Sequence, residues 1–191
     1  MTSSGNLWVG KRHGRKSNTV TIACRGPVFR PPESITAAHN VSGFSCSREE
    51  LNIWLKRRAF ANEGRTARTY VVTHGPAVVG YYAIAAGAVS REELPKALRH
   101  DNPEQIPVVV LGRLATDKNY EGRGIGRGML QEAITRTLTA ATEIGVRALL
   151  VHAVDEEAVK FYLKFGFVPS PIGDRTLLLP VETARRAFLA K

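Results

Sequence analysis

The sequence predicts one α/β domain built around a strand–helix–strand unit with two neighbouring parallel strands. Residues 108–115 and 146–154 are apolar segments typical of buried strands, and residues 124–144 between them are predicted as a long amphipathic helix. The apolar side chains of this helix recur on one face, at Leu130, Ile134, Leu138 and Ala141. A strand, a crossover helix and a second strand pair in parallel, which favours a mixed central sheet with flanking helices. The length agrees, because 191 residues give room for one domain with a real core.

The segments before this unit predict a short strand, a helix and a β-hairpin. Residues 34–37 form the short strand, and the helix runs over 45–62 with Ser47 as its N-cap. The hairpin pairs residues 68–73 with 78–89 around a Gly-Pro turn. The remaining segments are predicted as a helix over 91–99, a helix capped by Asp155 and ended by Gly166, a hairpin of 167–169 with 176–179, and a helix over 182–189.

Positive charge is concentrated at the N-terminal end. The net charge is +10, but residues 1–30 hold six basic and no acidic residues, whereas the rest of the chain holds 21 basic and 17 acidic residues. We therefore interpret residues 1–32 as a basic, mobile arm and residues 33–191 as the folded domain. A basic patch attracts polyanions, so nucleic acid or a phosphorylated ligand is an expected partner, and a solvated tail is the alternative interpretation.

Several classes of function are disfavoured. No run of about 18 apolar residues is present and no apolar signal peptide opens the chain, so we expect a cytoplasmic protein without a membrane partner. Cys24 and Cys46 stand apart from each other, and the five histidines form no pair at metal-ligand spacing. We therefore expect neither a disulfide framework nor a metal site.

The strongest chemical motif is a glycine-rich turn over residues 122–128, where glycine occupies every second position at the start of a helix. Backbone amides that no side chain shields can wrap around a phosphate group. The motif is neither G-x-x-x-x-G-K-[ST] nor G-x-G-x-x-G, which excludes the Walker and Rossmann loops. The neighbouring cations Arg123 and Arg127 favour a pyrophosphate ligand over a carboxylate, and a purely structural strand-to-helix turn is the alternative.

Two motifs in this order resemble the GCN5-related N-acetyltransferase (GNAT) family. The first is the pyrophosphate loop [QR]-x-x-G-x-[GA], here Glu121-Gly122-Arg123-Gly124-Ile125-Gly126, in which Glu121 departs from the family and is expected to face solvent. The second is an aromatic helix ending in Phe-Gly-Phe, here Phe161-Tyr162-Leu163-Lys164-Phe165-Gly166-Phe167. Longer segments resemble the GNAT toxins of toxin–antitoxin pairs, namely 54–59, 80–83, 111–117, 148–158 and 167–171.

The resemblance implies a GNAT fold, with a mixed sheet whose two central parallel strands splay apart around acetyl-CoA. It assigns the cofactor to Leu114, Ala115, Thr116, Gly122, Arg123, Gly124, Ile125, Gly126, Arg127, Gly128, Asp155 and Phe161. It implies that Tyr162 donates a proton to the departing thiolate. A phenol with a pKa near 10 stays protonated beside a thiol with a pKa near 8.5. On its pattern alone, Tyr162 could instead be a core residue of the helix face.

The toxin resemblance further implies that the substrate is the α-amino group of aminoacyl-tRNA, and that its acetylation blocks translation. Candidate tRNA contacts are Arg57, Arg58, Arg65, Arg68, Arg91 and Arg113. The implied protein partners are a ribbon-helix-helix antitoxin and a second copy of the chain in a homodimer. Two alternatives remain open at this point: a GNAT enzyme acting on a protein or small-molecule amine, and a nucleic-acid-binding module without catalysis.

Overall fold

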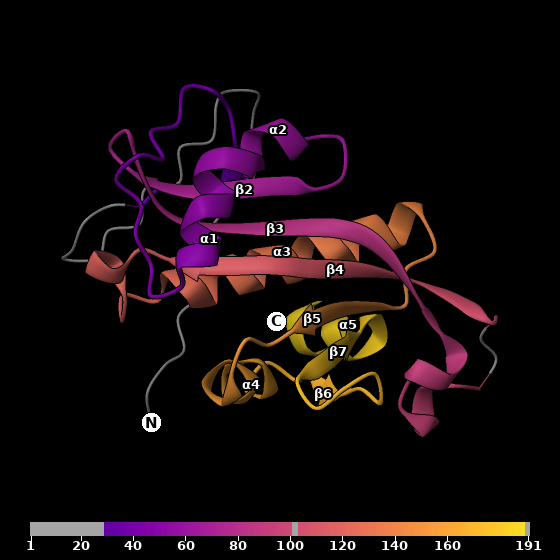
Figure 1. Cartoon of the computed structure of the whole chain (residues 1–191). Coiled ribbons are helices and arrows are strands. Elements are labelled where there is room, and N and C mark those ends of the chain that lie inside the picture. The colour runs from indigo at the N-terminus through magenta and orange to yellow at the C-terminus, as the bar shows by residue number, and fades with distance from the viewer. Residues whose placement is uncertain (1–28, 101–102, 190–191) are drawn as a thin grey trace. The chain divides into compact units, whose positions relative to one another are not determined.

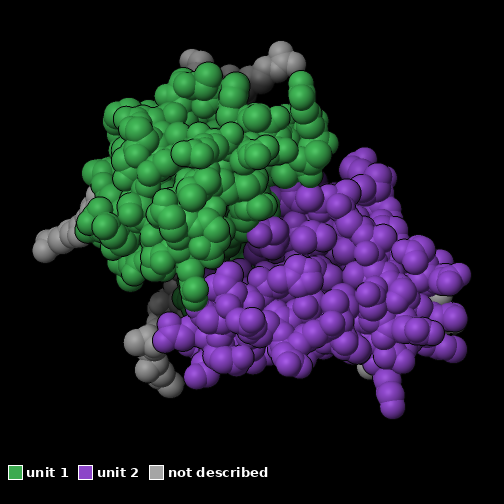
Figure 2. Space-filling view, viewed as in Figure 1, with its two compact units in different colours: residues 1–83, 113–132 green, residues 84–112, 133–191 purple. Residues whose placement is uncertain are grey.

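The computed structural model describes residues 29–100 and 103–189, so most of the expected basic arm lies outside the described residues. The chain divides into two compact units (Figure 2). The first consists of residues 1–83 and 113–132, and the second of residues 84–112 and 133–191. In the described residues, seven strands are hydrogen-bonded in the order β1-β2-β3-β4-β5-β7-β6, and β2 to β7 are labelled in Figure 1. The sheet contains antiparallel and parallel pairs, which confirms the predicted α/β class and mixed sheet.

The first unit begins with short elements that differ from the sequence prediction. In chain order they are β1 (Glu33–Ser34), α1 (Glu49–Trp54), a π-helical turn (Leu55–Ala59), α2 (Phe60–Asn62) and β2 (Arg68–His74). The strand is shorter than predicted, and the helix starts at Glu49, so Ser47 is not its N-cap. The physical reason is Asn52, whose side-chain oxygen accepts from Cys46 N at 2.8 Å and whose amide donates to Cys46 O at 3.1 Å. These bonds hold the chain outside the helix at the residues where the prediction began it.

The predicted hairpin is present, with β3 (Ala77–Ser90) following β2 across a turn at Gly75 and Pro76. The residues of β3 alternate between two faces, as those of any strand do. Tyr81 packs toward α1 and the π-helical turn, whereas a Cβ at Gly80 would lie only 2.9 Å from Ile125 Cγ2 of α3 (Ile125–Glu143). In this unit the sheet is therefore covered on both faces.

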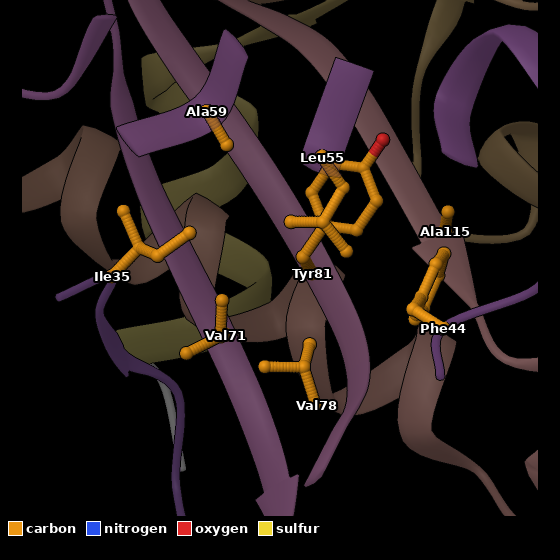
Figure 3. Packing of buried hydrophobic residues seen from close by; sticks show 8 residues of the cluster. All are labelled: Ile35, Phe44, Leu55, Ala59, Val71, Val78, Tyr81 and Ala115. Carbon is orange, nitrogen blue, oxygen red and sulfur yellow. The ribbon is translucent and has the colours of Figure 1, made fainter. Parts of the chain in front are cut away.

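The core of the first unit is a cluster of apolar side chains from β2, β3, the end of β4, the π-helical turn and the loop between β1 and α1 (Figure 3). Its buried members are Ile35, Phe44, Leu55, Ala59, Val71, Val78, Tyr81 and Ala115. Leu51 and Trp54 pack against this cluster while remaining partly exposed. The core thus fixes α1 and the π-helical turn on the face of the sheet that carries Tyr81.

The second unit contains the remaining strands together with later parts of β3 and α3 and the first part of β4. Its elements include two 3₁₀ turns (Arg91–Glu93 and Lys96–Leu98), β5 (Ala148–His152), α4 (Glu156–Leu163), β6 (Val168–Pro169), β7 (Thr176–Pro180) and α5 (Val181–Leu189). The helix predicted over 91–99 is wrong, because Pro95 interrupts it and leaves two separate turns. The predicted hairpin is confirmed, since β6 and β7 pair antiparallel.

The parallel pair that the sequence predicts is formed by β4 (Gln105–Thr116) and β5. Their register runs from Val108 opposite Ala148 to Leu111 opposite Val151. In the described residues β4 continues beyond this pairing to Thr116, whereas β5 ends at His152 and pairs on its other side with β7. Five residues at the end of β4 therefore follow the last paired position, and these include Leu114, Ala115 and Thr116, which are expected to contact the pantetheine arm of acetyl-CoA. No helix of the described residues is long and apolar enough to span a membrane.

Candidate functional site

The glycine-rich turn has the backbone geometry that an anion site needs. Gly122 and Gly124 adopt positive φ angles of 71° and 79°, a region that other residues enter only at a cost. The hydrogen bond from Gly128 N to Gly124 O, at 3.0 Å, closes the first turn of α3. The amides of residues 125–127 precede this bond, and the first amides of a helix have no carbonyl acceptor within the helix. The turn thus fits a pyrophosphate, which such amides and the positive end of the helix dipole stabilise.

Three charged side chains surround the turn, and all are exposed. Arg123 lies over the ring of Tyr120, with its guanidinium carbon 5.1 Å from the ring centroid, and donates to Asn119 O at 3.3 Å. Arg127 is exposed on the first turn of α3. Glu121 is exposed, as expected. The turn therefore carries two cations, one of which is held against an aromatic ring.

A buried carboxylate that the sequence analysis did not assign anchors the end of β4, just before this turn. Asp117 is 4% exposed and accepts hydrogen bonds from Ser45 N at 2.8 Å and Asn119 N at 2.9 Å. Its own amide donates to Val79 O at 2.9 Å. These bonds connect the end of β4 to β3 and to the segment before α1. The signal in the sequence was the Asp-x-Asn pattern directly after an apolar strand, which is typical of a side chain that caps a turn.

The three residues predicted to contact the pantetheine arm form the end of β4 in the same unit as the turn. Ala115 is buried, whereas Leu114 and Thr116 are half-buried. A Cβ built on Gly126 would lie 3.6 Å from Thr116 Oγ1, so the strand end and the start of α3 are neighbours. The first unit therefore brings together the predicted pantetheine and pyrophosphate residues.

The predicted acid Tyr162 lies in α4, in the second unit. Its side chain is 6% exposed, and its ring lies 5.3 Å from the rings of both Phe161 and Phe167. Burial raises the pKa of the Tyr162 phenol well above its ordinary value, because the interior penalises the phenolate. Phe161 is half-buried, and Asp155 caps α4 by accepting from Ala158 N at 2.8 Å, as predicted. The phenol is therefore protonated in the fold, as its ordinary pKa near 10 already implies at neutral pH.

The six candidate arginines occupy different environments. Arg57 and Arg58 are exposed together on the π-helical turn, and Arg65 is exposed in the following loop. Arg68 pairs with Glu63 at 3.2 Å, and Arg91 lies on a 3₁₀ turn of the second unit. Arg113 is half-buried, with its guanidinium carbon 4.2 Å from the ring centroid of Trp54. The candidates thus comprise two consecutive exposed residues, Arg57 and Arg58, and four cations in other settings.

The described residues hold no group of three or more His, Cys, Asp or Glu side chains placed to bind a metal ion.

Comparisons with known proteins agree with this geometry. The chain matches the acetyltransferase (GNAT) domain family over residues 65–169. It is 39% identical over 158 residues to a tRNA-acetylating toxin of Mycobacterium tuberculosis, a match that covers 82% of this chain and 95% of that protein.

Two solved structures of the toxin AtaT have the same fold. AtaT complexed with acetyl-methionyl-tRNAfMet matches with a TM-score of 0.77 and 28% identity, over 82% of this chain and 98% of that chain. A tyrosine-to-phenylalanine mutant of AtaT, bound to the C-terminus of the antitoxin AtaR and to acetyl-CoA, matches with a TM-score of 0.71 and 26% identity, over 83% and 97% of the two chains. The chain therefore belongs to the GNAT acetyltransferase family, and it is similar over most of its length to tRNA-acetylating toxins.

Proposed function

We propose that this chain is a toxin that transfers the acetyl group of acetyl-CoA to the α-amino group of aminoacyl-tRNA. The similarity to a tRNA-acetylating toxin along most of both chains is the observation that carries this proposal. Acetylation turns the amine into an amide, which cannot act as the nucleophile in peptide-bond formation. The expected consequence in a cell is therefore a block of translation.

Acetyl-CoA supplies the activated acetyl group as a thioester. For its diphosphate we propose the turn over residues 122–128, where the amides at the start of α3 donate hydrogen bonds and Arg123 and Arg127 add positive charge. For its pantetheine arm we propose Leu114, Ala115 and Thr116, whose strand end neighbours this turn. Asp155 and Phe161 are proposed as further contacts from the start and the middle of α4.

For proton transfer we propose Tyr162 as the general acid. The ordinary pKa of a phenol is near 10 and burial raises it further, so Tyr162 is protonated throughout the physiological pH range and can donate to the thiolate that leaves. The reaction has less need of a general base than acetylation of a lysine side chain has, because an α-amine has a pKa near 8 and lysine has one near 10.4. A useful fraction of the substrate amine is therefore neutral without help from the protein.

The partners follow from the same proposal. Arg57, Arg58, Arg65, Arg68, Arg91 and Arg113 are proposed as contacts to tRNA phosphates, with Arg57 and Arg58 as an adjacent pair on one turn. Because AtaT binds the C-terminus of its antitoxin AtaR, we propose a cognate antitoxin here, of the ribbon-helix-helix class. We also propose a cytoplasmic location. We further propose a homodimer, and analytical ultracentrifugation would test this oligomeric state.

The test of the proposed function is acetyl transfer from radiolabelled acetyl-CoA to aminoacylated total tRNA, with deacylated total tRNA as the matched control. Label should enter the aminoacylated pool alone and should leave the RNA with the amino acid under mild alkali, which cleaves the ester. Equal labelling of both pools, or labelling only of added protein or small amines, would contradict the proposal. Binding of acetyl-CoA, measured by calorimetry, separates an enzyme from a GNAT-like nucleic-acid-binding module.

A further inference from the structure

Three aromatic rings and one guanidinium form a continuous stack within the first unit. Phe44 meets Tyr81 edge to face at 5.5 Å, and Tyr81 stacks on Trp54 at 5.8 Å with only 13° between the rings. Arg113 covers the indole of Trp54 at 4.2 Å. Tyr81 and Phe44 belong to the buried core, as Figure 3 shows, whereas Trp54 and Arg113 are half-buried. The stack therefore leads from the core toward solvent and ends in a cation.

The indole in this stack is held in place by its surroundings. Tyr81 donates a hydrogen bond to Leu51 O at 2.9 Å, and Leu51 lies in α1 three residues before Trp54. Trp54 is the last residue of α1, and the π-helical turn starts directly after it. Single π-helical turns inside helices are rare and frequently occur at functional sites. The backbone irregularity thus falls at the residue whose ring supports Arg113.

The guanidinium at the end of the stack is not neutralised. No carboxylate of the described residues lies within ion-pair distance of Arg113, in contrast to Arg68, which pairs with Glu63 at 3.2 Å. An arginine side chain normally samples many rotamers, and stacking on an aromatic face removes most of that freedom. Arg113 is therefore a cation that is ordered before any ligand arrives, with its planar fork of N–H donors available.

The position of Arg113 relates it to the chemistry. It directly precedes Leu114, Ala115 and Thr116, the proposed pantetheine contacts, and it lies two residues from Ala115, whose side chain packs in the cluster with Tyr81. A planar guanidinium matches a phosphodiester through two parallel hydrogen bonds. The proposed substrate supplies such a group next to its reactive end.

From these observations we propose that Trp54 is a positioning residue, which holds the Arg113 guanidinium as a fixed fork for a phosphodiester near the aminoacyl end of tRNA. This inference rests on the proposed function. It differs from a role for Arg113 as one cation in a diffuse basic surface, because it makes the effect of Arg113 depend on Trp54. It also separates Arg113 from exposed arginines such as Arg65.

The test is a double-mutant cycle in which the KM values for aminoacyl-tRNA and for acetyl-CoA are measured separately. Arg113→Gln should raise the KM for aminoacyl-tRNA roughly tenfold to a hundredfold, the range for a hydrogen bond to a charged group, and leave the KM for acetyl-CoA within about twofold. Arg113→Lys should recover little, because lysine keeps the charge but lacks the fork. Trp54→Leu should resemble Arg113→Gln, and Trp54→Phe, which keeps an aromatic face, should restore most of the affinity.

The decisive result is the double variant. Trp54→Leu with Arg113→Gln should be no weaker than Arg113→Gln alone, within about twofold, whereas Trp54→Leu with Arg65→Gln should show the product of the two single effects. Independent effects of Trp54 and Arg113, or equal rises in both KM values, would overturn the inference. Because Trp54→Leu also removes packing, the cycle is run with Trp54→Met and Arg113→Gln if that variant fails to fold. Methionine fills more of the space without offering an aromatic face, so the same dependence between the two residues is expected. A wild-type chain that acetylates no aminoacyl-tRNA would instead overturn the proposed function, and the inference with it.

Discussion

Replacing Tyr162 by phenylalanine removes one oxygen atom from a ring whose packing stays the same. The ring contacts with Phe161 and Phe167, both at 5.3 Å, involve carbon atoms that phenylalanine retains. The expected loss of folding stability is therefore about 1 kcal/mol or less. Loss of a general acid typically lowers the rate by about 10²- to 10⁴-fold, which corresponds to roughly 3–5 kcal/mol in the activation barrier. The effect on chemistry should thus exceed the effect on stability several times over.

The assay follows CoA release in the presence of saturating aminoacyl-tRNA, with thermal unfolding and acetyl-CoA calorimetry on the same preparation. We expect a kcat that falls by at least about a hundredfold, a Tm within a few degrees of the wild type, and a nearly unchanged Kd for acetyl-CoA. The matched control is Tyr70→Phe, because Tyr70 is also a buried tyrosine, 8% exposed, with its ring stacked on Tyr82 at 5.1 Å. Its kcat should stay close to that of the wild type.

Two outcomes would refute the reasoning about Tyr162. A kcat within about threefold of the wild type would show that the phenol does not supply the proton, since even a modest general acid contributes more. A fall in kcat that Tyr70→Phe reproduces would assign the effect to the loss of any buried hydroxyl. In either case Tyr162 would be a core residue of α4, the alternative that its sequence pattern left open.

Three further changes test the loop, its anchor and the pH dependence. Gly126→Ala should weaken acetyl-CoA binding, measured by calorimetry, because the added Cβ stands beside the proposed phosphate. Tm should stay nearly constant, because this Cβ meets Thr116 only at an ordinary contact distance of 3.6 Å. Unchanged binding would argue against a phosphate at this turn. Asp117→Ala should lower the free energy of unfolding, measured in urea, by roughly 2–4 kcal/mol, because it leaves two backbone amides without their acceptor. Asp117→Asn should lower it less. Equal stability of the wild type and both variants would show that the carboxylate is not the anchor. The phenol of Tyr162 is neutral in both the folded and the unfolded chain below about pH 10, and its raised pKa favours the protonated form in the fold. Its contribution to folding stability should therefore be constant up to about pH 10 and fall above that pH. For the same reason kcat/KM should rise as the substrate amine loses its proton near pH 8 and then stay level to about pH 9.5, and a decline in initial rates within that window would contradict the assignment.

Local patterns in the sequence determined the main elements of the fold. The helix over Ile125–Glu143, the strands on either side of it and the hairpin of β2 and β3 all follow from periodicity and from turn residues, which act between neighbours along the chain. The Asp155 cap was predictable for the same reason, since a capping side chain reaches a backbone amide only three residues away. Where a more distant bond or a proline intervened, as at Asn52 and Pro95, the predicted helix began late or broke.

Contacts between distant segments could be decided only by the tertiary structure. Asp117 accepts a hydrogen bond from Ser45, 72 positions away in the sequence, and the indole of Trp54 contacts Arg113 of another element. Neither contact produces a periodic pattern in the sequence. The sequence and its family resemblance named Arg113 and Tyr162 as candidates. Only the structure shows that burial raises the pKa of the Tyr162 phenol and that the Arg113 guanidinium lies over an indole. Residue type and spacing thus specify which chemical groups are present. The low dielectric and the fixed neighbours of the folded chain set their protonation and orientation.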